Sequence, residues 1–240
     1  MNFLKKLPIK YKGELHDIKL VNFLVDMDEV KHLVPPLIKI RDFGGKAMIS
    51  MVDVKLKKMH PTFIPSFLHF GYRHIAFRLL VDDAYLNNGE CKGIFFLKAF
   101  TNKAHIVFGG KMLTEYRLEN AIIKDGLDSV VIKQGINKIA YQRDDKTPEN
   151  PIEFSNLKDI IGALDRAYSV VDGKLRVTQI QREKWPIEPV ACAFFKNSFF
   201  KSSELQGVFR VKEVIYYSWL PAAVVKESSS NKVKIQVITT

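Results

Sequence analysis

The residue with the clearest chemical potential is an arginine inside an apolar stretch. Residues 75–81 read IAFRLLV, and Arg78 is the single charged side chain among them. A guanidinium that points into a protein interior must meet an anion or several carbonyl groups, because burying an unpaired charge is costly. Arg78 is therefore a candidate to bind the carboxylate of a small molecule. The alternative is a structural ion pair, with Glu115 or Glu119 as the partner.

The histidines and cysteines predict neither a metal centre nor a disulfide framework. The six histidines are isolated, and no two of them have the spacing of metal ligands on a helix, so we expect structural or surface roles. Cys91 and Cys192 do not form a C-x-x-C motif, which favours free thiols. We find no glycine-rich phosphate loop, and Gly109-Gly110 reads as a kink in a strand.

Composition excludes several classes of protein. The net charge is +11, but the lysines are scattered, and the densest cluster, KLKKM at 55–59, holds only three. Without a nucleic-acid-binding motif, this charge indicates a solvated surface. No apolar run reaches the roughly 18 to 20 residues that a membrane-spanning helix needs, and the N-terminus lacks the apolar stretch of a signal peptide. We expect a cytoplasmic protein with one domain over residues 1–240 and no membrane or nucleic-acid partner.

The elements that must position these side chains are mostly strands. In residues 46–59 apolar and polar side chains alternate as in a strand. Turn residues at the spacing of hairpins predict further strands, namely HIAFRLLVDD, KGIFFLKAF, HIVFGGKML, EYRLENAIIK, LDSVVIKQG and NKIAYQR. GVFRVKEVIYYSWLP reads as one late strand. The pattern predicts an α+β fold, mainly antiparallel, with a curved or closed sheet and two or three helices.

Two segments have the pattern of helices. MDEVKHLVPP predicts a short helix with Asp26 as its N-cap, Glu29 completing a capping box, and Pro35-Pro36 ending it. NLKDIIGALDRAYSVVDGKL carries apolar residues at helical spacing, and a strand then begins with LRVTQIQRE.

Two regions resemble acetoacetate decarboxylases. VDMDEVKHLVPPLIKI (25–40) is similar to their N-terminal helix segment, and residues 92–121 align without gaps to the hairpin that carries their active site. The resemblance implies a β-rich double-cone barrel with an internal pocket, an oligomer of identical chains, and no cofactor.

A third region resembles an uncharacterised bacterial branch of the same superfamily. Its motifs correspond to FRLLV (77–81) and GKLRVTQIQREKWPIEPV (173–190). Arg78 falls on the arginine of the branch, whereas Ala76 and Leu80 depart from its asparagine and tyrosine. The Trp-Pro pair and the later proline of the branch match Trp185, Pro186 and Pro189.

The residues that the resemblance makes catalytic are missing. In the decarboxylases a Pro-Lys-Lys run supplies a lysine that forms an imine and a neighbour that lowers the pKa of that lysine. Arg117, Leu118 and Glu119 stand at these positions, and Leu24 replaces an arginine of the N-terminal segment. Leucine cannot form an imine, and a carboxylate raises the pKa of a nearby amine. We therefore expect the fold without the known reaction.

The residues around Leu118 would then line the internal pocket. If this stretch is a regular strand, one face holds the position of the nucleophile and carries Met112, Thr114, Tyr116 and Leu118. That face is apolar apart from a hydroxyl and a phenol, so it suits a hydrophobic ligand. Lys111 would point away, and Lys98 is a candidate whose face the sequence leaves open.

Three hypotheses follow. The first is a protein, or an enzyme of unassigned reaction, that binds a small molecule in an internal pocket where Arg78 orients an anionic or carbonyl group. The second is a lyase, hydratase or condensing enzyme on oxo acids, with Glu115 or Glu119 as the acid and base. The third is a structural or interaction protein without a ligand.

Overall fold

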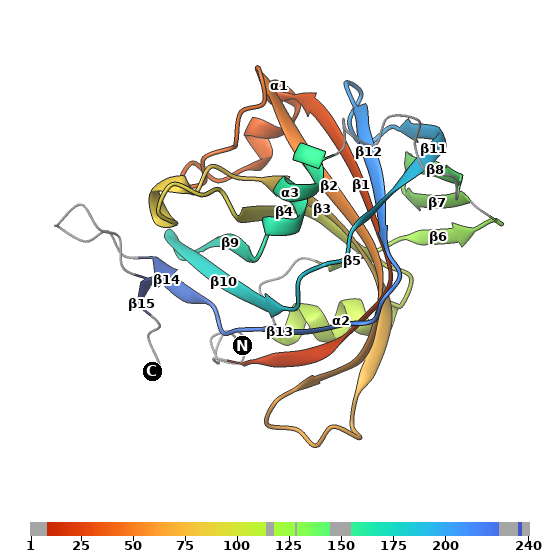
Figure 1. The fold of residues 1–240 in the computed structure, drawn as a ribbon. Helices are drawn as coiled ribbons and strands as arrows, with labels where there is room; N and C mark the ends of the chain where they lie inside the picture. Colours follow the sequence, from red (N-terminus) through yellow and green to blue (C-terminus); the bar gives the residue numbers. More distant parts are fainter. Residues whose placement is uncertain (1–8, 114–117, 128, 145–154, 226–234, 237–240) are drawn as a thin grey trace.

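The structure is a computed structural model that describes residues 9–113, 118–127, 129–144, 155–225 and 235–236. Most of these residues belong to one strongly curved β-sheet (Figure 1). Neighbouring strands are antiparallel except where β4 (Gly93–Thr101) meets β5 (Leu118–Asn120) and β9 (Arg166–Val171). The predicted fold, mainly antiparallel with a few short helices, is confirmed.

One part of the sheet closes into a barrel. Three long strands lie side by side, namely β1 (Tyr11–Asp26), β2 (Lys46–Pro61) and β3 (Phe70–Leu80). From β3 the sheet continues through β4 and β9 to β10 (Lys174–Arg182). The ring closes at β13 (Ile215–Trp219), which pairs with both β10 and β1. Closure removes the exposed sheet edges that would otherwise invite aggregation.

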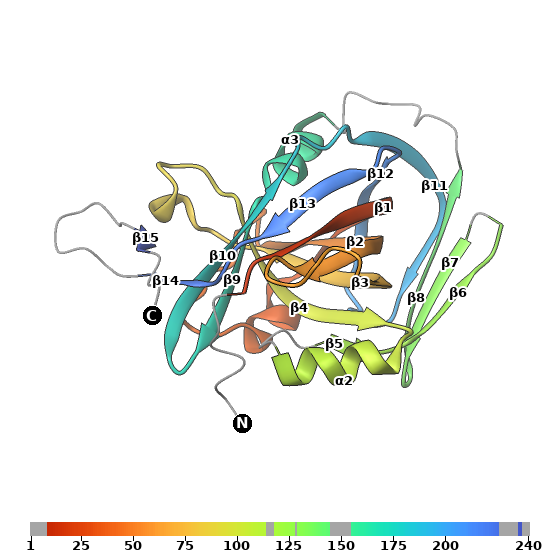
Figure 2. The same cartoon turned by 90° about the horizontal axis from the view of Figure 1, so that it is seen from below.

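A second curved wall extends from the C-terminal half of β1, along the same edge that β13 joins (Figure 2). Its strands are β12 (Glu204–Val211), β11 (Glu188–Asn197), β8 (Asn137–Asp144), β7 (Ser129–Gln134) and β6 (Ile122–Asp125). Beyond β10, two short strands continue the sheet, β14 (Ala223–Val225) and β15 (Ile235–Gln236).

The long strands are therefore covered on both faces, and residues 47–54 of β2 are buried at every position. The apolar cluster inside the barrel, here the barrel core, includes Leu20, Val52, Ala76, Ala99 and Leu118. The cluster between the long strands and the second wall, here the second core, includes Phe23, Phe77, Phe100, Tyr141 and Phe200. Because successive side chains of a strand point to opposite faces, the position of a residue in its strand decides which core it joins.

The short N-terminal helix is present but is not capped as predicted. Helix α1 (Met27–Val30) and the 3-10 helix η2 (Lys31–Leu33) end just before the two prolines. The side chain of Asp26 makes no cap hydrogen bond, so the capping box is wrong. Instead the Glu29 carboxylate accepts hydrogen bonds from the backbone N–H groups of Lys201 and Ser202, which connect β11 to β12.

The predicted strand over residues 105–113 is also wrong, because α2 (Ala104–Leu113) occupies this stretch. Met112 is thus helical and does not share a strand face with Leu118, contrary to the prediction. Thr114, Glu115, Tyr116 and Arg117 lie outside the described residues.

The remaining helices are α3 (Ser155–Ala163), which covers the first part of the predicted helical segment, and the 3-10 helix η3 (Ala84–Leu86). The later part of that predicted helix is wrong, because strand β9 occupies Arg166–Val171. Helix α3 buries Leu157 and Ile161 against the barrel core. The single late strand predicted from the sequence is divided into β12 and β13. Among the residues that the structure describes, no helix has the length and apolarity needed to cross a membrane.

Candidate functional site

Arg78 lies on the face of β3 that points into the barrel. Its neighbours at the same face, Ala76 and Leu80, both belong to the barrel core, and Arg78 itself is only 7% exposed. The strand register places Arg78 opposite Ser50 of β2. The guanidinium donates to the Ser50 carbonyl oxygen (3.1 Å) and to Ser50 Oγ (2.8 Å). The inward orientation considered from the sequence is therefore the observed one, and a full positive charge sits inside the barrel.

Trp185 lies beside this charge. Its ring centroid is 5.8 Å from Arg78 Cζ and 4.3 Å from Arg182 Cζ. Arg182 is fixed by donating to the carbonyl oxygens of Gly162 (3.0 Å) and Leu164 (2.8 Å), just after α3. Burial lowers the pKa of Arg182 to about 10, so it remains a cation at neutral pH. The indole thus lies close to two guanidinium groups, and the electron-rich face of tryptophan attracts such cations.

The indole N–H of Trp185 has no acceptor. Nε1 is buried, and among the described residues no oxygen or nitrogen accepts its hydrogen. A buried donor without a partner costs roughly 1–3 kcal/mol, and such groups in folded proteins call for a specific reason, such as a bound molecule. Sequence reasoning interpreted Trp185 as a packing residue, because a lone Trp-Pro pair carries no signal of a donor left unpaired.

His74 adds a neutral, titratable group to the same face of β3. It stands four residues before Arg78 and is 7% exposed. Burial lowers its pKa to about 4, and the positive charge of Arg78 contributes in the same direction. His74 is therefore uncharged at neutral pH, and its imidazole can both donate and accept a hydrogen bond. The sequence assigned it a structural or surface role, since its distance from Arg78 along a strand becomes meaningful only once the strand is known.

Leu118 occupies the same interior surface. It pairs with Ala99 of β4, and Ala99 pairs with Ala76 of β3, so the three side chains form one row inside the barrel. Two strand spacings separate Leu118 from β3, which is about 10 Å. Leu118 is 4% exposed and belongs to the barrel core. The position that the resemblance assigns to the nucleophile is thus an aliphatic surface near Arg78.

The other catalytic candidates do not converge with Arg78. Lys98 pairs with Phe77, and Glu119 pairs with Phe100, so both register positions belong to the face of the second core. The Glu119 carboxylate accepts a hydrogen bond from Gln134 of β7. The side chain of Met112 lies outside the described part of the structure, as do Thr114, Glu115 and Tyr116.

A separate ionic network stabilises the second core. Arg73 binds Asp53 through two hydrogen bonds of 2.8 and 2.7 Å, and it also binds Asp125. The hydroxyl of Tyr141 donates to Asp53 Oδ2 at 2.7 Å. Asp53 is only 1% exposed, so its charge depends on these partners. The network connects β2 and β3 with β6 and β8 and has a structural role. Among the described residues, no group of three or more His, Cys, Asp or Glu side chains is placed to hold a metal ion.

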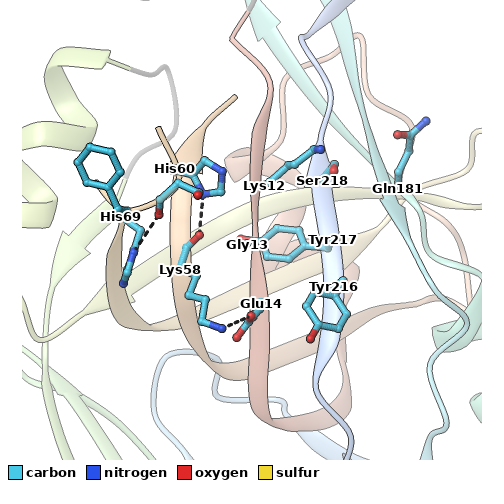
Figure 3. Close-up of a pocket in the computed structure, with 12 residues that line it drawn as sticks. Lys12, Gly13, Glu14, Lys58, His60, His69, Gln181, Tyr216, Tyr217 and Ser218 are labelled. Carbon is cyan, nitrogen blue, oxygen red and sulfur yellow. Dashed lines mark hydrogen bonds and ion pairs between the residues drawn. The ribbon is translucent and has the colours of Figure 1, made fainter. Parts of the chain in front are cut away.

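A cavity of about 600 Å³ lies on the outer wall of the barrel (Figure 3), whereas Arg78 points to the inner face. We call it the outer groove. It is bounded by β1, β2, β10, β13 and the loop between β2 and β3, and its lining includes Lys12, Glu14, His60, Phe67, Gln181 and Tyr216. None of the candidates from the sequence lines it.

Comparisons with known proteins give a family and a fold. The family model DUF2071, an uncharacterized conserved protein, matches residues 12–219. No curated protein matches the chain. An acetoacetate decarboxylase-like enzyme from Sphingomonas wittichii RW1 has 11% identity and a TM-score of 0.59, covering 94% of this chain and 96% of that chain.

Two further structures are similar. The acetoacetate decarboxylase of Legionella pneumophila has 14% identity and a TM-score of 0.59, covering 92% of this chain and 88% of that chain. The enduracididine biosynthesis enzyme MppR, complexed with pyruvate, has 12% identity and a TM-score of 0.52, covering 92% of this chain and 91% of that chain. At these sequence identities, the three comparisons show that the chains share a fold.

Proposed function

The chain belongs to the DUF2071 family and has the fold of acetoacetate decarboxylases, and from this premise we propose that it binds a small carboxylate or oxo acid inside the barrel. The observation that carries the proposal is the Trp185 N–H, a buried donor without an acceptor among the described residues, beside the buried cation Arg78. One carboxylate or carbonyl oxygen would satisfy the indole, and the negative charge would be attracted by Arg78.

The surroundings of Arg78 suit this class of ligand. A guanidinium shielded from water attracts an anion much more strongly than one at the surface. Ser50 and Trp185 restrict the orientation of Arg78, so little side-chain entropy is lost when a ligand binds. His74 is uncharged at neutral pH and can form a hydrogen bond with a bound molecule at this face. The aliphatic row that ends at Leu118 suits the apolar part of such a ligand.

The reaction of acetoacetate decarboxylases is not part of the proposal. It requires an amine at the position of Leu118, and the structure places a buried aliphatic side chain there. Pyruvate is bound in the structure of MppR, which makes small oxo acids the natural first probes for this chain.

Two alternatives stay open. A lyase, hydratase or condensing enzyme would need an acid and base near Arg78, and Glu119 lies on the opposite face of β5, hydrogen-bonded to Gln134. His74 suits that role better than Glu119 because it shares the face of Arg78. In the third class, a structural or interaction protein, the unpaired indole would have no ligand to bind.

Calorimetric titration with pyruvate and acetoacetate tests the proposal. We expect at least one of these anions to bind, and Arg78→Met to weaken its binding at least about tenfold, because a hydrogen bond to a charged group contributes roughly 1.5–3 kcal/mol. Arg78→Lys, which keeps the charge, should retain part of the affinity. Arg210→Met is the control, since Arg210 on β12 pairs with Glu188 far from this face. Equal affinity in Arg78→Met and the control would contradict the proposal.

A further inference from the structure

A row of polar side chains crosses the floor of the outer groove. The register pairs Gln181 with Ser218, Ser218 with Lys12, and Lys12 with His60. Directly paired residues point to the same face of a sheet, so these four side chains stand in line across β10, β13, β1 and β2. Figure 3 shows Lys12, Ser218 and His60 along the upper part of the groove. At about 4.8 Å per strand, the row is about 14 Å long.

The row carries a positive charge that no neighbouring side chain neutralises. Lys12 is exposed and forms no ion pair with any residue in the described part of the chain. The nearest carboxylate on its strand, Glu14, binds Lys58 Nζ at 2.8 Å and His16 Nε2 at 2.9 Å. The hydrogen bond from Lys58, together with that from His16, holds the pKa of Glu14 below its ordinary value. Glu14 is thus already paired, and the ammonium of Lys12 remains available to an anion.

His60 supplies a second polar group beside Lys12. Its Nδ1 lies 2.9 Å from the backbone carbonyl oxygen of Lys58, which can only accept. The ring proton therefore resides on Nδ1, and Nε2 is left to accept a hydrogen bond from a ligand.

Two exposed aromatic rings complete the groove. Phe67, in the loop between β2 and β3, is 74% exposed, and Tyr216 of β13 is 61% exposed, and both line the cavity. Large aromatic side chains with so much free surface offer flat apolar faces for another ring. The cavity volume of about 600 Å³ lies within the range of small-molecule sites, roughly 300–1,000 Å³.

We propose that the outer groove is a second binding site, for a small anion with a planar apolar part, such as an arylcarboxylate. The anionic group lies over Lys12 and the hydroxyl of Ser218, and the planar part contacts Phe67 and Tyr216. The net charge of +11 over the chain favours the approach of such anions. This site is on the outer face of the barrel, and Arg78 is on the inner face, so the inference is independent of the proposed function.

Titration with 1-naphthoate, followed by NMR, tests the inference. We expect the amide signals of Lys12 and Ser218 to shift in a saturable manner. The neutral analogue 1-naphthalenemethanol should bind more weakly, because it lacks the charge that Lys12 attracts. Lys12→Met should weaken naphthoate binding about three- to fivefold, the magnitude of an exposed ion pair, and Phe67→Ser about fivefold through loss of ring contact.

Matched controls separate this site from other sites. Lys57→Met and Phe63→Ser replace an exposed lysine and an exposed phenylalanine outside the lining of the groove, and both should leave the affinity unchanged. Arg78→Met should also leave it unchanged. The inference is overturned if the neutral analogue binds equally well, if Lys12→Met behaves like Lys57→Met, or if Arg78→Met abolishes binding.

Discussion

Lowering the pH should destabilise the fold through His74. The pKa of His74 is about 4 in the folded protein, against an ordinary value of 6.5, because burial and the charge of Arg78 disfavour the protonated ring. Between these two values the unfolded chain binds a proton that the folded chain does not bind. The contribution is therefore fully present above about pH 6.5 and is lost as the pH falls towards 4. Between about pH 7.5 and 4.5, the loss in free energy of unfolding is about 2.5 kcal/mol.

Urea unfolding at several pH values measures this loss. His74→Gln keeps a polar side chain of similar size but cannot be protonated. The loss of about 2.5 kcal/mol that the parent protein shows between about pH 7.5 and 4.5 should therefore be absent from the variant. His105→Gln is the control, because His105 is exposed and should keep the pH dependence of the parent protein. If His74→Gln shows the same pH dependence as the parent, or if NMR titration gives His74 an ordinary pKa, the account of this face of the barrel is wrong.

Other predictions concern the second core and the missing nucleophile. Arg73→Met should lower the free energy of unfolding by about 3–5 kcal/mol in urea, because it leaves the buried Asp53 charge without its main partner; a loss below about 1 kcal/mol would argue against a structural role. The double variant Leu118→Lys, Glu119→Lys should release no carbon dioxide from acetoacetate, since Leu24 leaves the N-terminal arginine of the decarboxylases without an equivalent and a new cation at position 118 would be buried in the barrel core; robust turnover would contradict this. Borohydride treatment of the parent protein with acetoacetate should trap no adduct on a lysine within residues 92–124, as mass spectrometry would show.

The sequence predicted those features that depend on local pattern. Alternating apolar residues and turn residues identified most strands, including the hairpin of β7 and β8, where Gln134 pairs with Asn137. The inward orientation considered for Arg78 could also be read from the sequence, because all its neighbours in the run 75–81 are apolar. Such features need no knowledge of what packs against them.

Features that depend on distant contacts could not be predicted. Residues 104–113 contain β-branched residues and a glycine pair, which favour a strand or a kink locally, yet Ile106 and Val107 pack on the barrel core from a helix. Tertiary packing here outweighs propensity. Glu29 likewise binds a loop about 170 residues further along the chain rather than its own helix.

The candidate site was only partly visible for the same reason. Arg78 and His74 share a face because the chain forms a regular strand there, and Ser50 lies opposite Arg78 only because of the register between β2 and β3. Trp185 joins them from the segment after β10, and its unpaired N–H has no signature in the sequence. An apolar run around a charged residue predicts that the charge is buried. Which other side chains lie beside that charge depends on how the strands pair.

The most direct test of the proposed function follows the indole N–H of Trp185 by NMR. The chain has two tryptophans, so a spectrum of ¹⁵N-labelled protein should show two indole signals, and Trp185→Phe assigns them. On titration with the small carboxylate or oxo acid that binds in calorimetry, the Trp185 signal should move downfield as Nε1–H donates to the ligand, while the Trp219 signal changes little. Saturable binding that leaves the Trp185 signal in place, or that persists unchanged in Trp185→Phe, would contradict a ligand site at Arg78 and Trp185.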